Sequence, residues 1–151
     1  MRIADCGFPE RPAFGVCRYL GRLTETVSIA HMTPQDFKAR TKSYALRIIA
    51  VVEALPGDSV SRTLGNQLLR CGTSVAANYR ASARAKSNAD FVSKMGTVEE
   101  ECDESVLWME LLTESKRLEK SSCEDLMAEG NEILAMTVAS VRTARDSLRR
   151  T

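Results

Sequence analysis

Two long apolar stripes, separated by only a few residues, occupy the centre of the sequence between Leu64 and Leu112. In each half, apolar or small residues recur at alternating spacings of four and three, the period of a helix packed along one side. Two long helices joined by a short connection pack side by side in opposite directions. The sequence therefore predicts an antiparallel helical hairpin. Its two stripes are Leu64, Leu68, Cys71, Val75, Asn78, Ser82 and Phe91, Met95, Val98, Cys102, Ser105, Met109, Leu112.

The sequence on either side of the hairpin has the same period and clear boundary residues. Thr33-Pro34 is a typical helix start, and residues 56–57, Pro-Gly, end that helix. We expect the third helix to run to about Glu119 and a serine at 121–122 to cap a fourth. Residues 33–150 are thus predicted to form one all-α domain, an antiparallel up-and-down four-helix bundle. The first helix should bury Phe37, Thr41, Tyr44, Ile48, either Val51 or Val52, and Leu55, and the last should bury Leu126, Ile133, Thr137, Val141, Ala144 and Leu148.

Residues 1–31 do not share this pattern. We interpret them as a loose extension, or translation as starting at Met32, so that 32–151 is the bundle domain. An amphipathic arm over 14–29 that docks on a partner is the alternative. No apolar run reaches the length of a signal peptide or a membrane span, and the five cysteines are scattered without a Cys-x-x-Cys pair. These features predict a cytoplasmic protein that does not contact membranes.

Charge is divided unequally between the two helices of the hairpin. Residues 59–87 hold five bases and no acid, whereas residues 88–125 hold eleven acids and four bases. One interpretation is that basic and acidic helices face each other within the bundle or between subunits. The other is that the basic segment forms a nucleic-acid-binding face. Its residues are Arg62, Arg70, Arg80, Arg84 and Lys86.

The sequence offers little for catalysis. The single histidine, His31, lies outside the patterned domain, so the bundle has no Cys–His or Ser–His nucleophilic pair. Di-iron bundles use Glu-x-x-His pairs, whereas Glu101 and Glu104 have no histidine beside them. We therefore predict no catalytic residue, no metal and no cofactor.

Several polar residues have two interpretations each. Asn78 lies on an apolar stripe, where it either fixes helix register as a buried, hydrogen-bonded side chain or contacts a ligand. Glu101 and Glu104 either form ion pairs with Arg80 or Arg84, or act as a general acid–base pair. Finally, Tyr79 is a candidate stacking surface for a nucleobase.

The third helix also carries apolar residues away from its core stripe. Leu107 and Leu111 lie roughly opposite that stripe, and Trp108 lies on its flank. Apolar residues outside an intramolecular core indicate a second buried surface. We therefore expect self-association through this part of the helix, although broad packing within one chain could also bury these residues.

Polar, glycine and apolar positions together resemble a known family. The following runs are similar to the signature of the bacterial four helix bundle protein family: 67–70 (QLLR), 73–81 (TSVAANYRA), 84–87, 89–91, 94–96, 99–105 and 108–112. Its members were first noticed as products of intervening sequences in 23S ribosomal RNA genes. The resemblance covers roughly 32–150 and implies an antiparallel bundle that forms a homopentamer, without established catalysis. A similar accessory protein of diversity-generating retroelements works with a reverse transcriptase and nucleic acid, which here would require an exposed basic face.

The sequence thus favours a non-enzymatic binding or scaffold protein that assembles into a homo-oligomer, for which the resemblance implies a pentamer. The alternative is an accessory protein that binds RNA, DNA or a nucleic-acid enzyme through the basic second helix. A third hypothesis, an enzyme with Glu101 and Glu104 as catalytic carboxylates, requires both to line an exposed cleft.

Overall fold

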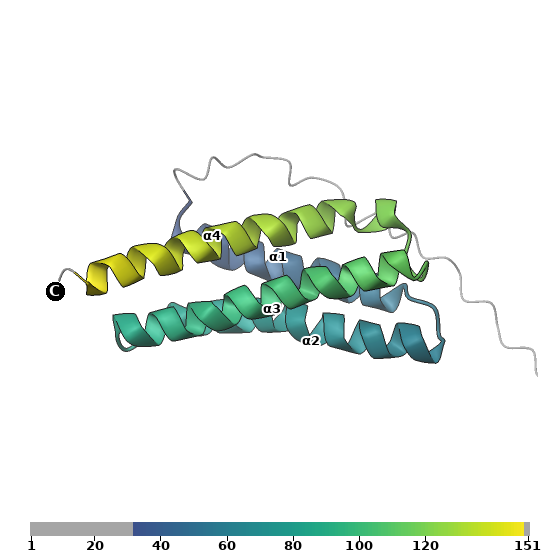
Figure 1. Ribbon diagram of the computed structural model, residues 1–151, viewed down its shortest axis with the longest axis horizontal. Coiled ribbons are helices and arrows are strands. Elements are labelled where there is room, and N and C mark those ends of the chain that lie inside the picture. Colours follow the sequence, from purple (N-terminus) through teal and green to yellow (C-terminus); the bar gives the residue numbers. More distant parts are fainter. Residues whose placement is uncertain (1–31, 150–151) are drawn as a thin grey trace, which may run out of the picture.

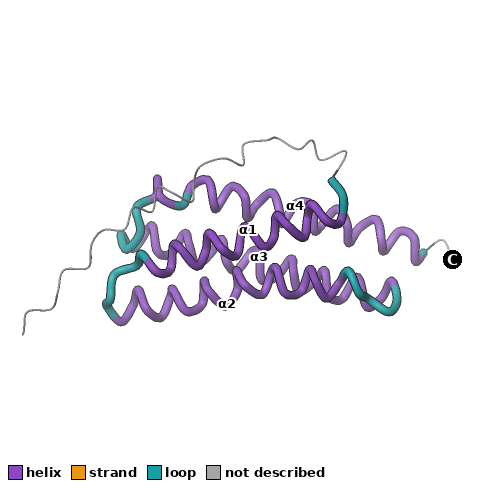
Figure 2. The backbone as a smooth tube through the Cα atoms, turned by 180° about the vertical axis from the view of Figure 1, so that it is seen from behind, coloured by secondary structure: helices purple, strands orange, loops and turns teal. Residues whose placement is uncertain are grey.

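Four long α-helices run up and down along a common axis in the computed structural model, which describes residues 32–149 (Figure 1). Within that range no residue is in a β-strand. The view from behind, in which α1 lies toward the viewer, shows the short connections that join successive helices (Figure 2). The predicted all-α four-helix bundle is confirmed. The helices are α1 (Pro34–Glu53), α2 (Ser59–Ser82), α3 (Asn88–Glu114) and α4 (Glu124–Leu148), with a short 3-10 helix, η3 (Lys120–Ser122).

The first three helices begin at side chains that satisfy their free backbone N–H groups. Thr33 caps α1 in a capping box, in which its own N–H donates to the Asp36 carboxylate over 2.9 Å. Asp58 caps α2 by accepting from two backbone N–H groups, and Ser87 caps α3 by accepting from the backbone of Asp90. The start at Thr33 is the one expected from the sequence.

The connection between α3 and α4 differs from the expectation. Helix α3 ends at Glu114, not near Glu119, because Lys116 adopts a left-handed conformation with φ of 59° that a helix cannot continue through. The serines at 121–122 lie in η3 and do not cap α4. Cys123 occupies that position and makes no capping hydrogen bond through its side chain.

Most of the predicted stripe residues are buried, but the buried face of α2 is offset slightly from the predicted stripe. Gly65 and Tyr79 are buried, whereas their neighbours Leu64 and Asn78 are only partly buried. Ser82, the last residue of the stripe, is buried as expected. At the end of α4, Leu148 is 44% exposed and does not belong to the core.

Helix α1 is held to its neighbours in two different ways. It approaches α2 closely at Gly72, where an added Cβ atom would clash with the side chain of Ile48. Against α4 it packs more sparsely, and the link is polar: Arg40 forms a bidentate ion pair with Glu129, at 2.6 and 2.8 Å. Tyr44, on the same helix, adds a buried contact to α3 and α4.

Residues 1–31 and 150–151 lie outside the described range. The expectations about the extension, the arm over 14–29 and His31 therefore stay predictions. In the part of the chain that the structure describes, every helix is too short or too polar to cross a membrane.

Candidate functional site

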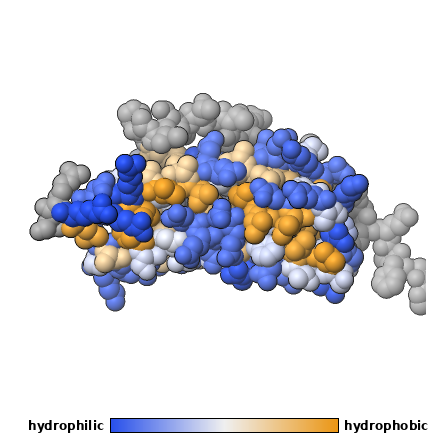
Figure 3. All heavy atoms as spheres, viewed as in Figure 1, coloured by the Kyte–Doolittle hydropathy of each residue, from blue (hydrophilic) through white to orange (hydrophobic). Residues whose placement is uncertain are grey.

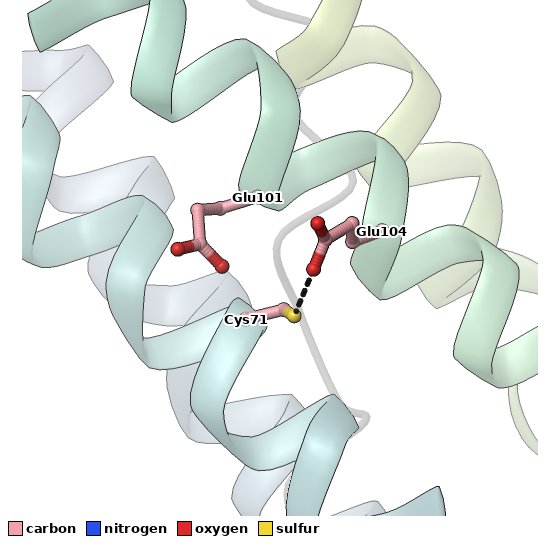
Figure 4. Close-up of side chains that lie close together, drawn as sticks. All are labelled: Cys71, Glu101 and Glu104. Atoms are coloured by element: carbon pink, nitrogen blue, oxygen red, sulfur yellow. Dashed lines mark hydrogen bonds between the residues drawn. The ribbon is translucent and has the colours of Figure 1, made fainter.

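The most concentrated group of reactive side chains lies between α2 and α3. The guanidinium of Arg70 contacts two carboxylates of α3, with 2.9 Å from Nη2 to Oε2 of Glu104 and 3.5 Å from Nη1 to Oε1 of Glu101. The neighbouring thiol of Cys71 donates to the same oxygen of Glu104 over 3.1 Å (Figure 4). We call Cys71, Glu101 and Glu104 the thiol–carboxylate cluster.

The two glutamates form ion pairs, as the first interpretation predicted, but with a different arginine. The hairpin turns at residues 83–87, and in an antiparallel pair residues equally far from the turn face each other. Arg70 lies opposite Glu101 and Glu104, whereas Arg80 and Arg84 lie beside the turn. The prediction of Arg80 or Arg84 as partner is therefore wrong.

Burial and neighbouring charge make Cys71 a poor nucleophile. Desolvation, followed by hydrogen bonding to the adjacent glutamates, raises the pKa of its thiol to about 12. The group is thus protonated at neutral pH, and the thiolate is the reactive form. Two shallow grooves lie elsewhere, between α3 and α4, and neither is lined by Glu101 or Glu104. This geometry gives no support to catalysis by the two carboxylates.

Helix α3 presents apolar side chains on its outer surface beside the cluster. Leu107 is 46% exposed and Leu111, one turn further on, is 37% exposed. Trp108 between them is partly buried, and its indole N–H is shielded from solvent without a hydrogen-bond partner. Apolar residues gather over the half of α3 that leads to the α3–α4 connection (Figure 3). We call Leu107, Trp108 and Leu111 the α3 outer patch.

The basic residues do not form one free surface. Arg62, near the start of α2, donates to the carbonyl of Gly57 over 3.1 Å, and Arg70 is paired with α3. Arg80, Arg84 and Lys86 are exposed around the α2–α3 turn, and no described residue forms an ion pair with them.

Two polar residues on α2 differ from the roles considered for them. The hydroxyl of Tyr79 donates to the carbonyl of Pro34 over 3.0 Å, and its ring packs edge-on against Phe37. A ring held in the core cannot stack on a base, so that interpretation is wrong. Asn78 is partly buried and donates to Ser74 within its own helix, not to another helix.

Sequence reasoning missed the part that Cys71 has in the cluster. It identified Cys71 as a core residue, which is confirmed, and tested the cysteines only for Cys-x-x-Cys pairs and for pairing with a histidine. Matching residues equally distant from the hairpin turn places Cys71 opposite Glu99, at the start of the acidic segment that holds Glu101 and Glu104.

Comparison with known proteins identifies the family. The sequence model of the 23S rRNA-intervening sequence protein family matches residues 35–139, most of the bundle. The chain belongs to this family. The match contains the thiol–carboxylate cluster and the α3 outer patch, and it confirms the resemblance seen in the sequence.

A solved structure agrees with this assignment. It is a protein of unknown function from the S23 ribosomal protein family of Bacteroides thetaiotaomicron, 27% identical to this chain. The two superpose with a TM-score of 0.68, over 74% of this chain and 99% of the other. No curated protein matches the sequence.

Proposed function

We propose that this member of the family is a non-enzymatic binding or scaffold protein that self-assembles through the α3 outer patch. The observation that carries the proposal is the pair of exposed leucines, Leu107 and Leu111, beside an indole N–H that is buried without a partner. Exposed apolar side chains that adjoin one another are typical of protein interfaces, in which aromatic residues are enriched. The family resemblance implies five copies.

The state of the cluster supports a binding role over an enzymatic one. Glu101 and Glu104 are paired with Arg70, and the thiol of Cys71 is held protonated by burial. None of these groups is placed as an activated nucleophile beside a general base. Their contacts tie α2 to α3, which fixes the surface that α3 presents.

Tryptophan fluorescence tests self-assembly directly, because Trp108 is the only tryptophan in the chain. In the assembled state we expect a blue-shifted emission that acrylamide quenches poorly. Leu111→Glu should give a red-shifted, readily quenched emission at the same concentration, since a buried carboxylate opposes association. Leu46→Glu, which changes a 56% exposed leucine on α1, is the matched control and should behave as the wild type. Identical spectra for the wild type and Leu111→Glu would contradict the proposal.

A second candidate function, nucleic-acid binding, is favoured by Arg80 and Arg84, which are exposed and free of ion pairs with described residues. Phosphate contacts release counterions, so such binding must weaken steeply with salt. The double variant Arg80→Ala/Arg84→Ala should then weaken binding of a labelled RNA and reduce the slope of log K against log salt by about 2. Arg62→Ala, at the other end of α2, is the control. Equal affinity of the double variant and the wild type would exclude this function for the turn.

A further inference from the structure

The thiol–carboxylate cluster brings together three side chains that can each give one ligand atom to a cation. The thiol sulfur of Cys71 and carboxylate oxygens of Glu101 and Glu104 all lie within 4.8 Å of one another. Cys71 comes from α2 and the two glutamates from successive turns of α3, so rigid helices hold all three (Figure 4). Only modest side-chain rotations would bring these atoms to a common centre.

One atom of the cluster is left without a partner. Oε2 of Glu101 is shielded from solvent and accepts no hydrogen bond, although the Glu101 side chain is 15% exposed. A buried carboxylate oxygen without a donor destabilises the folded state, because it has lost its hydrogen bonds to water and has formed none within the protein. A cation at the cluster would satisfy it.

We propose that Cys71, Glu101 and Glu104 form a binding site for a thiophilic divalent cation of the Zn²⁺ class. One sulfur and two carboxylate oxygens suit Zn²⁺, which takes both donor types in tetrahedral sites and leaves one position for water. The sulfur disfavours Mg²⁺ and Ca²⁺, which select oxygen donors. Binding replaces the S–H bond by an S–Zn bond, and the proton passes to solvent.

Arg70 is the competitor for this site. Its Nη2 lies 2.9 Å from Oε2 of Glu104 and 3.4 Å from the sulfur of Cys71. The guanidinium thus lies where a bound cation would lie, and it neutralises the same carboxylates. The Arg70 side chain is 56% exposed, which leaves it free to move into solvent when a cation enters. We therefore expect opposite effects on Zn²⁺ binding: removal of Cys71 weakens it, and removal of Arg70 strengthens it.

The test is titration of the full chain with Zn²⁺ alone, in competition with a chromophoric chelator. Cys71→Ser and Glu101→Gln should each weaken Zn²⁺ binding by at least about tenfold, because each removes a ligand. Two matched controls should leave it unchanged: Cys123→Ser, a second buried thiol, and Glu100→Gln, the exposed neighbour of Glu101. Cys6, Cys17 and His31 are present in every variant, so adventitious binding to them cancels in the comparison.

Two further measurements distinguish Zn²⁺ binding at the thiol–carboxylate cluster from nonspecific binding to the protein surface. Arg70→Ala should tighten Zn²⁺ binding, and Co²⁺ in place of Zn²⁺ should give a sulfur-to-metal absorption band in the wild type that Cys71→Ser lacks. If Cys71→Ser binds Zn²⁺ as well as Cys123→Ser does, only adventitious binding occurs and the proposal is overturned. Arg70→Ala with weakened binding would overturn it too. Neither result depends on whether the chain self-assembles.

Discussion

Replacing Tyr44 by alanine should lower the free energy of unfolding by about 4 kcal/mol, the range found when large buried aromatic side chains are truncated. Tyr44 is fully buried, and its hydroxyl lies 2.7 Å from Oγ of Ser105 on α3. It also fits against Gly130 of α4, where a Cβ atom would lie only 2.7 Å from the Tyr44 oxygen. Because α1 and α4 pack sparsely elsewhere, the cavity left by the truncated side chain would weaken the interface between these helices, which has few other contacts.

Tyr44→Phe separates the ring from the hydroxyl. Ser105 also donates to the carbonyl of Cys102 over 2.7 Å, so it keeps one hydrogen bond when the phenol is lost. The expected cost is about 1 kcal/mol, that of an ordinary hydrogen bond. Urea unfolding at one fixed protein concentration measures both variants, because self-association would otherwise contribute to stability. An alanine variant no less stable than the phenylalanine variant would show that Tyr44 does not link the helices.

Leu111→Glu should reduce the particle mass to that of one chain, 16.7 kDa, while the far-ultraviolet circular dichroism stays helical. Leu111 is 37% exposed and lies outside the core, so a glutamate there remains solvated in the single chain. In an assembled interface every copy would bury the new carboxylate, at a cost of several kcal/mol per ion.

The control for this variant is again Leu46→Glu, a more exposed leucine on a different helix, which should keep the wild-type mass. If both leucine variants lose assembly equally, the interface is not specific to the α3 outer patch. If Leu111→Glu unfolds, its circular dichroism will show it, and Leu107→Gln then provides a milder change on the same surface.

The fold could be predicted because its signals are local. The four-three spacing identifies the helices. Three of them begin at residues whose side chains accept hydrogen bonds from the first turn, Thr33, Asp58 and Ser87. The end of α3 could not be predicted in the same way. Nothing in the composition of residues 115–119 requires Lys116 to turn left-handed. In the structure this turn closes the end of α3, because it lets the N–H of Arg117 donate to the carbonyl of Leu112 over 2.9 Å.

The site could be predicted only in part, because it depends on the register between helices. Glu101 and Glu104 are three residues apart and therefore share one flank of α3, but which arginine reaches them depends on where the hairpin turns. The same register brings Cys71 to the two carboxylates. The burial of Tyr79 in place of Asn78, like that of Gly65 in place of Leu64, depends on how α2 is rotated against its neighbours, which a four-three count does not determine.

The solution mass of the wild-type full chain, measured by light scattering during gel filtration over a wide range of concentrations, tests self-assembly most directly. Our account predicts one discrete species at a multiple of 16.7 kDa, with five copies as the number implied by the family resemblance. A mass of 16.7 kDa at every concentration would contradict it, because the exposed leucines of α3 would then face only solvent.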